Sequence, residues 1–142
     1  MMPQEFVIDA NVFMAMLISG KAFYRPLMTQ FHFIAPAYLL EEIQTYYPII
    51  RKQSRLDDEA FWSFATFAFS HLTVLPPFWV EDTHQNKAQI LTNDVDPKDQ
   101  DYIALALALD VPLLTRDRVL HHGLRKQGFR RSILFDTFLR VI

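Results

Sequence analysis

The chain contains no cysteine and only three glycines among its 142 residues. Without cysteine it can form no disulfide and has no thiol nucleophile, which suits a reducing compartment. With so few glycines it has no glycine-rich loop of the kind that cradles phosphates. Its apolar runs are too often interrupted to span a bilayer, so no membrane association is expected. We therefore expect a soluble, cytoplasmic protein.

Length and composition predict one folded domain over residues 1–142, because a chain of this size supports one hydrophobic core. Hydrophobic residues make up 51% and charged residues 21%, which excludes a disordered chain. The first residues, MMPQEFVIDA, lack the basic start and long apolar stretch of a signal peptide. The net charge of −2 gives no overall attraction to nucleic acid, so contact with RNA would depend on local charge and on metal.

Hydrophobic periodicity and turn signals predict strands that alternate with helices. Strands are expected at residues 5–9, 31–35, 72–75, 112–115 and 132–135, and helices at 12–19, from 36 onward, and at 57–70, 80–91, 97–110 and 118–127. Asn11 is expected to cap the first helix and Pro36 to lie in the first turn of the second. Alternation of this kind predicts an α/β fold with a parallel sheet covered by helices on both faces.

Four acidic residues stand where such a fold would bring them together. Asp9 ends the first strand, Glu42 lies in the following helix, Asp99 opens a late helix, and Asp117 follows the next strand. In open parallel sheets, ligands bind beyond the carboxyl ends of the strands. Clustered carboxylates stay ionised only beside a counter-charge, and oxygen ligands suit Mg²⁺ or Mn²⁺. The positions therefore predict a divalent metal site and metal-dependent cleavage of a phosphodiester.

Three segments in this order, FVIDANVF, APAYLLEEI and DPKDQDYIALALALDVPLLTRD, resemble PIN domains, metal-dependent nucleases that include many VapC-type toxins. The resemblance covers nearly the whole chain. It implies a three-layer α/β/α sandwich with a central parallel sheet of about five strands. Differences such as the long aromatic middle of the chain indicate a divergent subgroup.

By this resemblance, Asp9, Glu42, Asp99 and Asp117 match the catalytic acids that hold Mg²⁺ or Mn²⁺ in the family. Asn11 and Thr115 match polar residues that support them. The resemblance further implies an RNA substrate and, for the VapC-type toxins, a protein antitoxin as partner.

Two of the acids have competing neighbours. Glu41 and Glu42 point about 100° apart on a helix, and Glu42 keeps the family spacing. Asp99 competes with Asp96 and Asp101. Asp99 shares the buried face of its helix with Ile103 and Ala106, whereas Asp101 turns away, so Asp99 is preferred. Asp96 is kept as a supporting ligand. Taken singly, each acid could instead cap a helix or lie in solvent, but those roles would not explain why four converge.

Basic and aromatic residues complete the candidate surfaces. Arg116 and Arg118 flank Asp117 and are predicted to bind the RNA backbone. The segment AFWSFATFAF has more apolar circumference than one packing surface buries. It is interpreted either as an interface, with a second copy in a homodimer or with an antitoxin, or as ordinary core.

The leading functional hypothesis is an endoribonuclease that is the toxin of a toxin–antitoxin pair. The alternative is a binding or scaffold protein that kept the PIN fold and lost catalysis. A receiver-like phosphoryl-transfer domain is disfavoured, since paired acids after the first strand and a lysine after a late strand are both missing.

Overall fold

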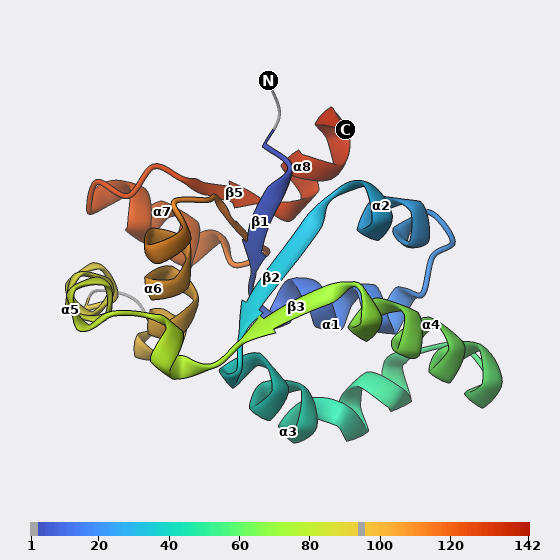
Figure 1. Cartoon of the computed structure of the whole chain (residues 1–142). Coiled ribbons are helices and arrows are strands. Elements are labelled where there is room, and N and C mark those ends of the chain that lie inside the picture. The colour runs from blue at the N-terminus through green and yellow to red at the C-terminus, as the bar shows by residue number, and fades with distance from the viewer. Residues whose placement is uncertain (1–2, 94–95) are drawn as a thin grey trace.

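A computed structural model of the chain describes residues 3–93 and 96–142 and shows five strands in one parallel sheet (Figure 1). The strand order is β3-β2-β1-β4-β5. The strands are β1 (Glu5–Ile8), β2 (His32–Pro36), β3 (Leu72–Leu75), β4 (Leu113–Thr115) and β5 (Ser132–Leu134). The predicted parallel sheet is thus confirmed. Strand β1 lies at its centre, with β2 and β3 on one side and β4 and β5 on the other.

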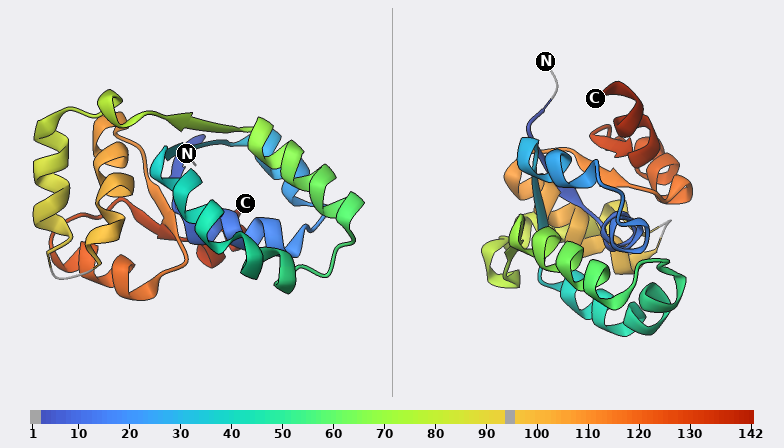
Figure 2. Two further views of the ribbon diagram at one scale, coloured as in Figure 1. Left: turned by 90° about the horizontal axis from the view of Figure 1, so that it is seen from below. Right: turned by 90° about the vertical axis from the view of Figure 1, so that its right-hand side faces the viewer.

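Eight α-helices and two short 3-10 helices connect the strands within the described residues. They are α1 (Ala10–Ser19), α2 (Tyr24–Gln30), α3 (Tyr38–Gln53), α4 (Asp58–Ser70), η1 (Pro77–Trp79), α5 (Asp82–Leu91), η2 (Pro97–Asp99), α6 (Gln100–Leu109), α7 (Arg118–Lys126) and α8 (Phe135–Val141). Helices α1 to α4 and α8 lie on one side of the sheet, and α5 to α7 lie on the other (Figures 1 and 2). The three-layer sandwich implied by the resemblance is therefore confirmed.

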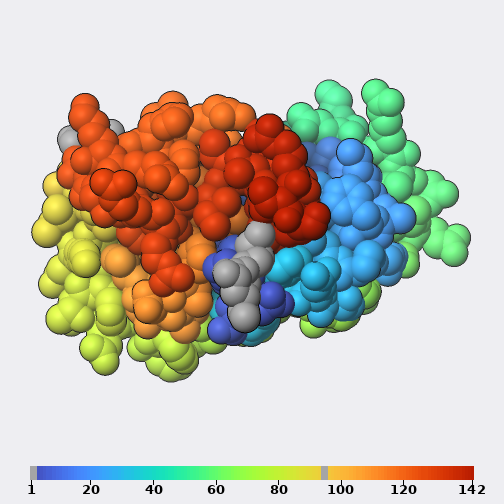
Figure 3. Space-filling model, turned by 90° about the horizontal axis from the view of Figure 1, so that it is seen from above, coloured from blue at the N-terminus to red at the C-terminus, as the bar shows by residue number. Residues whose placement is uncertain are grey.

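The central strand β1 is covered on both faces, which explains its uninterrupted apolar sequence. Phe6, Val7 and Ile8 are fully buried. On one face an aromatic cluster joins α8 to the sheet: the ring of Phe138 lies 5.0 Å from that of Phe6 and 5.2 Å from that of Phe31. Seen from above in Figure 3, α8 lies between the segment that contains α7 and the segment that contains α2. Edge-to-face contacts of this kind fix the packing geometry as well as burying area.

The longest of these helices, α3, has 16 residues and buries only Leu39, Ile43 and Ile50. Pro48 lies in its interior, where the proline nitrogen cannot donate the usual backbone hydrogen bond. Pro48 is exposed, so water can satisfy the carbonyl that loses its donor. Within residues 3–93 and 96–142, no helix combines the length and the apolar character needed to cross a bilayer.

Several predicted boundaries were wrong at the junctions between elements. Asp9, and not Asn11, caps α1, because its Oδ1 accepts a hydrogen bond from the Val12 amide and the helix begins at Ala10. Pro36 ends β2 by pairing with Leu75, and α3 begins at Tyr38. Both corrections place the strand ends next to the following helices, with almost no connecting loop.

Two helices were not predicted from the sequence. Helix α2 has seven residues and carries a proline near its start, so its own pattern is weak. Helix α8 begins at Phe135, a residue that the sequence pattern places in the last strand. Both helices bury aromatic rings against the rest of the protein: Tyr24 of α2 stacks on Phe135 with an interplanar angle of 19°. Tertiary packing therefore stabilises elements too short to be indicated by periodicity.

Replacing Gly20 by alanine is expected to lower the free energy of unfolding by about 1–3 kcal/mol, the cost of an unfavourable backbone conformation. Gly20 ends α1 in the left-handed region at φ 54°, where side chains are strained. A Cβ there would lie 2.3 Å from Cδ1 of Leu56, so this side chain must move as well. Denaturant titration of the two proteins measures the change. An unaltered unfolding midpoint would contradict the expectation.

Candidate active site

The acidic residues meet at the carboxyl ends of the central strands, beside the starts of α1, α6 and α7. A groove of about 500 Å³ opens there and is lined by residues that include Asn11, Glu42, Asp96, Lys98, Asp99, Arg116 and Asp117. Asp9 is buried at the β1–α1 junction, only 3% exposed. The charge of Asp9 is nevertheless close enough to repel the charges of Glu42, Asp99 and Asp117. The left panel of Figure 2 views the molecule from this end.

Asp9 is fixed by the junction that it caps. Its Oδ1 accepts a hydrogen bond of 2.9 Å from the Val12 amide, and the Thr115 side chain also bonds its carboxyl group. Burial nevertheless raises the pKa of Asp9 from its ordinary value of 3.8 to about 6, because desolvation outweighs these hydrogen bonds. An opposite charge close to Asp9 would therefore lower its pKa and favour the ionised form.

Thr115 links the ends of the two central strands. It is the last residue of β4 and is fully buried. Its hydroxyl oxygen accepts a hydrogen bond of 3.0 Å from the Asp117 amide, while its side chain bonds Asp9. Asp117 in turn caps α7, since its Oδ1 accepts from the Leu120 amide at 3.0 Å. One hydroxyl group thus holds the residues that carry the two strand-end carboxylates in register.

Asp99 and Asp96 differ in what their side chains do. Asp96 caps η2 by accepting from the Lys98 amide at 3.0 Å, and it is exposed. The Asp99 side chain caps nothing, although the residue directly precedes α6. Burial, followed by repulsion from Asp9 and other acids, raises the pKa of Asp99 to about 7. The capping role considered for Asp99 is therefore absent, and this carboxyl group lies in the groove.

Glu42 is half-buried on α3 and receives a hydrogen bond from the Tyr102 hydroxyl group of α6. Burial raises the pKa of Glu42, while the Tyr102 hydrogen bond and the nearby Lys98 oppose that rise. Its neighbour Glu41 is exposed and does not line this groove. The structure thus places Glu42, of this adjacent pair, beside the other acids.

The arrangement concentrates negative charge. Asp9, Glu42 and Asp99 all have a raised pKa, each mainly because of burial and with repulsion from other acids in addition. A group of three His, Cys, Asp or Glu side chains close enough to hold a metal ion as they stand is absent from residues 3–93 and 96–142. The donor set itself, carboxylate and amide oxygens without sulfur, fits Mg²⁺ or Mn²⁺. Mg²⁺ is usually held by one or two carboxylates with water in its remaining positions, so these residues fit such an ion without three acids in direct contact with it.

The two predicted substrate-binding arginines lie in different places. Arg116 is exposed and lines the acidic groove. Arg118 does not line that groove. Its guanidinium Nη2 lies 2.8 Å from Oδ2 of Asp136, in an adjoining cavity. Arg116 is therefore the arginine of this pair that is placed beside the acids.

Sequence reasoning missed Tyr102 and Lys98. Tyr102 follows Asp99 by three residues, so both lie on one side of the helical segment, and this spacing is the signal that could have identified it. The aromatic ring alone indicated core packing, and Tyr102 is indeed 1% exposed. The sequence pattern assigns no role to Lys98, yet this residue lines the groove beside the acids.

The fold and its acidic groove define a nuclease-like α/β protein, and comparison with known proteins agrees. A family model described as "PIN domain" matches residues 7–135, so the chain belongs to the PIN domain family. PAE2754 from Pyrobaculum aerophilum, known from a crystal structure, is similar in fold, with a TM-score of 0.66 over 96% of this chain and 87% of that one. The two sequences are 17% identical, so this likeness concerns the fold alone. No curated protein sequence matches the chain.

Proposed function

We propose that this protein is a metal-dependent endoribonuclease, the toxin component of a toxin–antitoxin pair of VapC type. Membership of the PIN domain family supports nuclease chemistry in general. The observation that carries the proposal is geometric: Glu42, Asp99 and Asp117 line one groove at the carboxyl end of the sheet, next to the buried Asp9. Carboxylates are kept together at the cost of a raised pKa where function requires them.

The proposed site divides the chemistry between a metal ion and the protein. Asp9, Glu42, Asp99 and Asp117 would hold Mg²⁺ or Mn²⁺, with Asn11, Thr115 and Asp96 in support. When bound, the ion would act as a Lewis acid that lowers the pKa of a water molecule and neutralises charge on the phosphate. Arg116 binds a phosphate oxygen at the edge of the groove and orients the RNA backbone. Thr115 keeps the Asp9 and Asp117 junctions in register.

The direct test compares cleavage of total RNA with cleavage of single-stranded DNA by the purified protein. Fragments are expected from RNA in Mn²⁺ or Mg²⁺, and none in excess chelator. Asp9→Asn protein is the control for a contaminating nuclease. Intact RNA in both metals would favour the alternative, a PIN-fold protein that binds without cleaving.

Tyr102→Phe is expected to raise the Mn²⁺ concentration for half-maximal cleavage by about tenfold, the lower end of what partners of metal ligands contribute. The substitution removes the hydroxyl group that orients Glu42 and opposes the rise in its pKa. The ring keeps its edge-to-face contact with Tyr38 at 6.3 Å, so folding should be preserved. A Mn²⁺ titration measures the shift. Thr83→Val, which removes an exposed hydroxyl group outside the groove, is the control, and an equal response of both variants would contradict the assignment.

We also propose a homodimer through the aromatic surface formed by Tyr47 of α3 and Trp62 of α4. Their rings lie 5.8 Å apart, and Trp62 is 52% exposed. An antitoxin that covers the same surface is the competing occupant. Light scattering is expected to give twice the chain mass of 16.7 kDa for the parent protein and the mass of one chain for Trp62→Glu. A monomeric parent protein would overturn the homodimer.

A further inference from the structure

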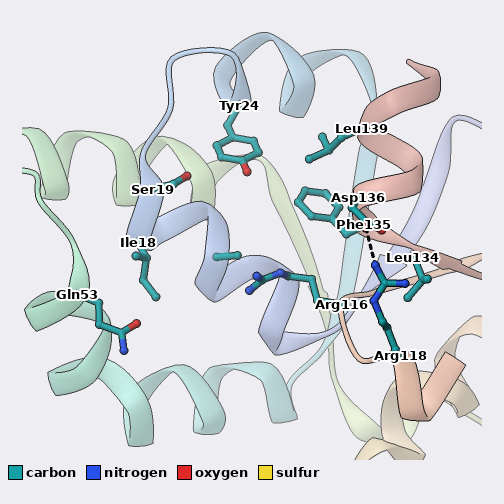
Figure 4. Close-up of a pocket in the computed structure, with 11 residues that line it drawn as sticks. Ile18, Ser19, Tyr24, Gln53, Arg116, Arg118, Leu134, Phe135, Asp136 and Leu139 are labelled. Carbon is teal, nitrogen blue, oxygen red and sulfur yellow. Dashed lines mark hydrogen bonds and ion pairs between the residues drawn. The ribbon is translucent and has the colours of Figure 1, made fainter.

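A second cavity, of about 580 Å³, adjoins the acidic groove (Figure 4). The two share Ala15, Ile18, Gln53 and Arg116 in their walls, so they form one continuous depression between α1 and the β4–α7 junction. A polymer whose phosphate lies over the acids would therefore place its neighbouring unit in the second cavity. The volume lies in the range of sites that take small ligands.

The walls of this cavity are of two chemical kinds. Apolar side chains come from Ile18 of α1, from Leu134, and from Phe135 and Leu139 of α8. The side chains of Ser19 and Tyr24 place hydroxyl groups toward the space, and Arg116 and Gln53 extend toward it from other elements (Figure 4). Such a combination suits a flat ligand with apolar faces and a hydrogen-bonding edge, which describes a nucleobase.

Ser19 provides an independent indication of a ligand. Its hydroxyl oxygen is buried and has no hydrogen-bond partner among the residues that the structure describes. Burying an unpaired hydroxyl group is unfavourable, so polar groups of this kind normally find a partner. Alanine at position 19 would avoid that cost and favour the helix. A ligand that enters the cavity and displaces the groups covering this oxygen would supply the missing hydrogen-bond partner.

Of the two arginines beside the cavity, Arg118 forms an ion pair and Arg116 is available to bind a ligand. Arg118 is paired with Asp136, their side chains 2.8 Å apart at the outer edge. No ion pair is found for Arg116 within residues 3–93 and 96–142. Arg116 lies where the groove and the cavity meet, so its guanidinium can serve a phosphate or the edge of a base.

From this geometry we infer that the second cavity binds one unstacked nucleobase of the RNA, next to the phosphodiester that lies over the acids. The inference rests on the proposed function, because it assigns the cavity to the same substrate. A base must leave the stack to enter, which selects single-stranded RNA over a paired helix. The cavity thereby gives the enzyme a preference for the nucleotide beside the cleaved bond.

Equilibrium binding tests the cavity separately from catalysis. Calorimetry without divalent metal compares AMP, GMP, CMP and UMP with ribose 5-phosphate, which lacks a base. At least one nucleotide is expected to bind about tenfold more tightly than ribose 5-phosphate, as a stacked base typically contributes. Four nucleotides that bind no better than ribose 5-phosphate would overturn the inference.

Two variants connect the binding to Ser19. Ser19→Leu fills the cavity and is expected to lower nucleotide affinity to that of ribose 5-phosphate. Ser19→Ala leaves the cavity open, removes only the hydroxyl group and is expected to weaken binding several-fold. Thr83→Leu, an exposed position on α5 outside both cavities, is the matched control and should bind as the parent does. Unaltered affinity in Ser19→Leu protein with a native thermal transition would overturn the assignment.

The base-site inference and the nuclease proposal can be contradicted independently of each other. If RNA stays intact while nucleotides bind through Ser19, the nuclease proposal is wrong and the base site stands. If RNA is cleaved but nucleotides bind no better than ribose 5-phosphate, the nuclease stands and the base site is wrong. Sequencing of the cleaved ends adds a second readout, since Ser19→Leu should lose the base preference of the parent protein.

Discussion

Asp99→Asn is expected to reduce Mn²⁺-dependent RNA cleavage by about 10²–10³-fold, the usual cost of removing one electrostatic partner of a transition state. Asp99 lies in the acidic groove, caps no helix with its side chain, and is repelled by the other acids. Its amide replacement keeps the shape but removes the charge that a metal ion requires. Initial cleavage rates at saturating Mn²⁺ measure the effect.

The neighbouring acids provide matched controls. Asp101→Asn changes the same chemical group two residues further on, outside the groove, and should cleave RNA at close to the parent rate. Glu42→Gln and the adjacent Glu41→Gln form a second pair, with the loss expected in Glu42→Gln alone. Equal rates within both pairs would show that these carboxylates are not part of the catalytic site.

The metal-free protein is expected to lose stability as the pH rises from 4 to 7. The folded-state pKa of Asp9 is about 6, above its ordinary value of 3.8, so the folded state binds the proton more tightly than the unfolded state. The stabilisation is complete below pH 3.8 and is lost as the pH passes through 6. For this buried group the difference is on the order of 3 kcal/mol, since one pKa unit corresponds to about 1.4 kcal/mol.

Denaturant titrations at pH 4, 5, 6 and 7 in chelator measure this dependence. Asp9→Asn cannot ionise at this position and should show a shallower decline than the parent protein. Added Mn²⁺ should raise the melting temperature of the parent at pH 7 more than at pH 5, because it binds the ionised carboxylates. A parent and an Asp9→Asn protein with the same pH dependence would exclude Asp9 as the source.

Much of the fold could be predicted from local patterns. The uninterrupted apolar run at residues 6–8 indicated a strand buried on both faces, and Asp96-Pro97 indicated a helix start. The errors fell where short elements depend on distant partners. Helix α2 is stabilised by contacts such as the stacking of Tyr24 on Phe135, which are distant in the sequence.

The candidate site shows the same division. That Asp9 and Asp117 follow strands was readable from the chain, because strand ends of a parallel sheet share one edge. The hydroxyl bridge through Thr115 and the hydrogen bond from Tyr102 to Glu42 were not, since they join residues from different elements. The resemblance suggested Thr115 as a supporting residue, and the structure shows which groups it contacts.

The sequence by itself determined the order of strands and helices, the parallel sheet and the positions of the acids along the chain. These follow from periodicity and turn chemistry, which act over a few residues. Only the tertiary structure decided that Asp9 is buried while Asp96 is exposed, that Arg118 pairs with Asp136, and that a second cavity adjoins the groove. Burial, charge pairing and cavities arise between segments distant in the sequence, so no local pattern specifies them.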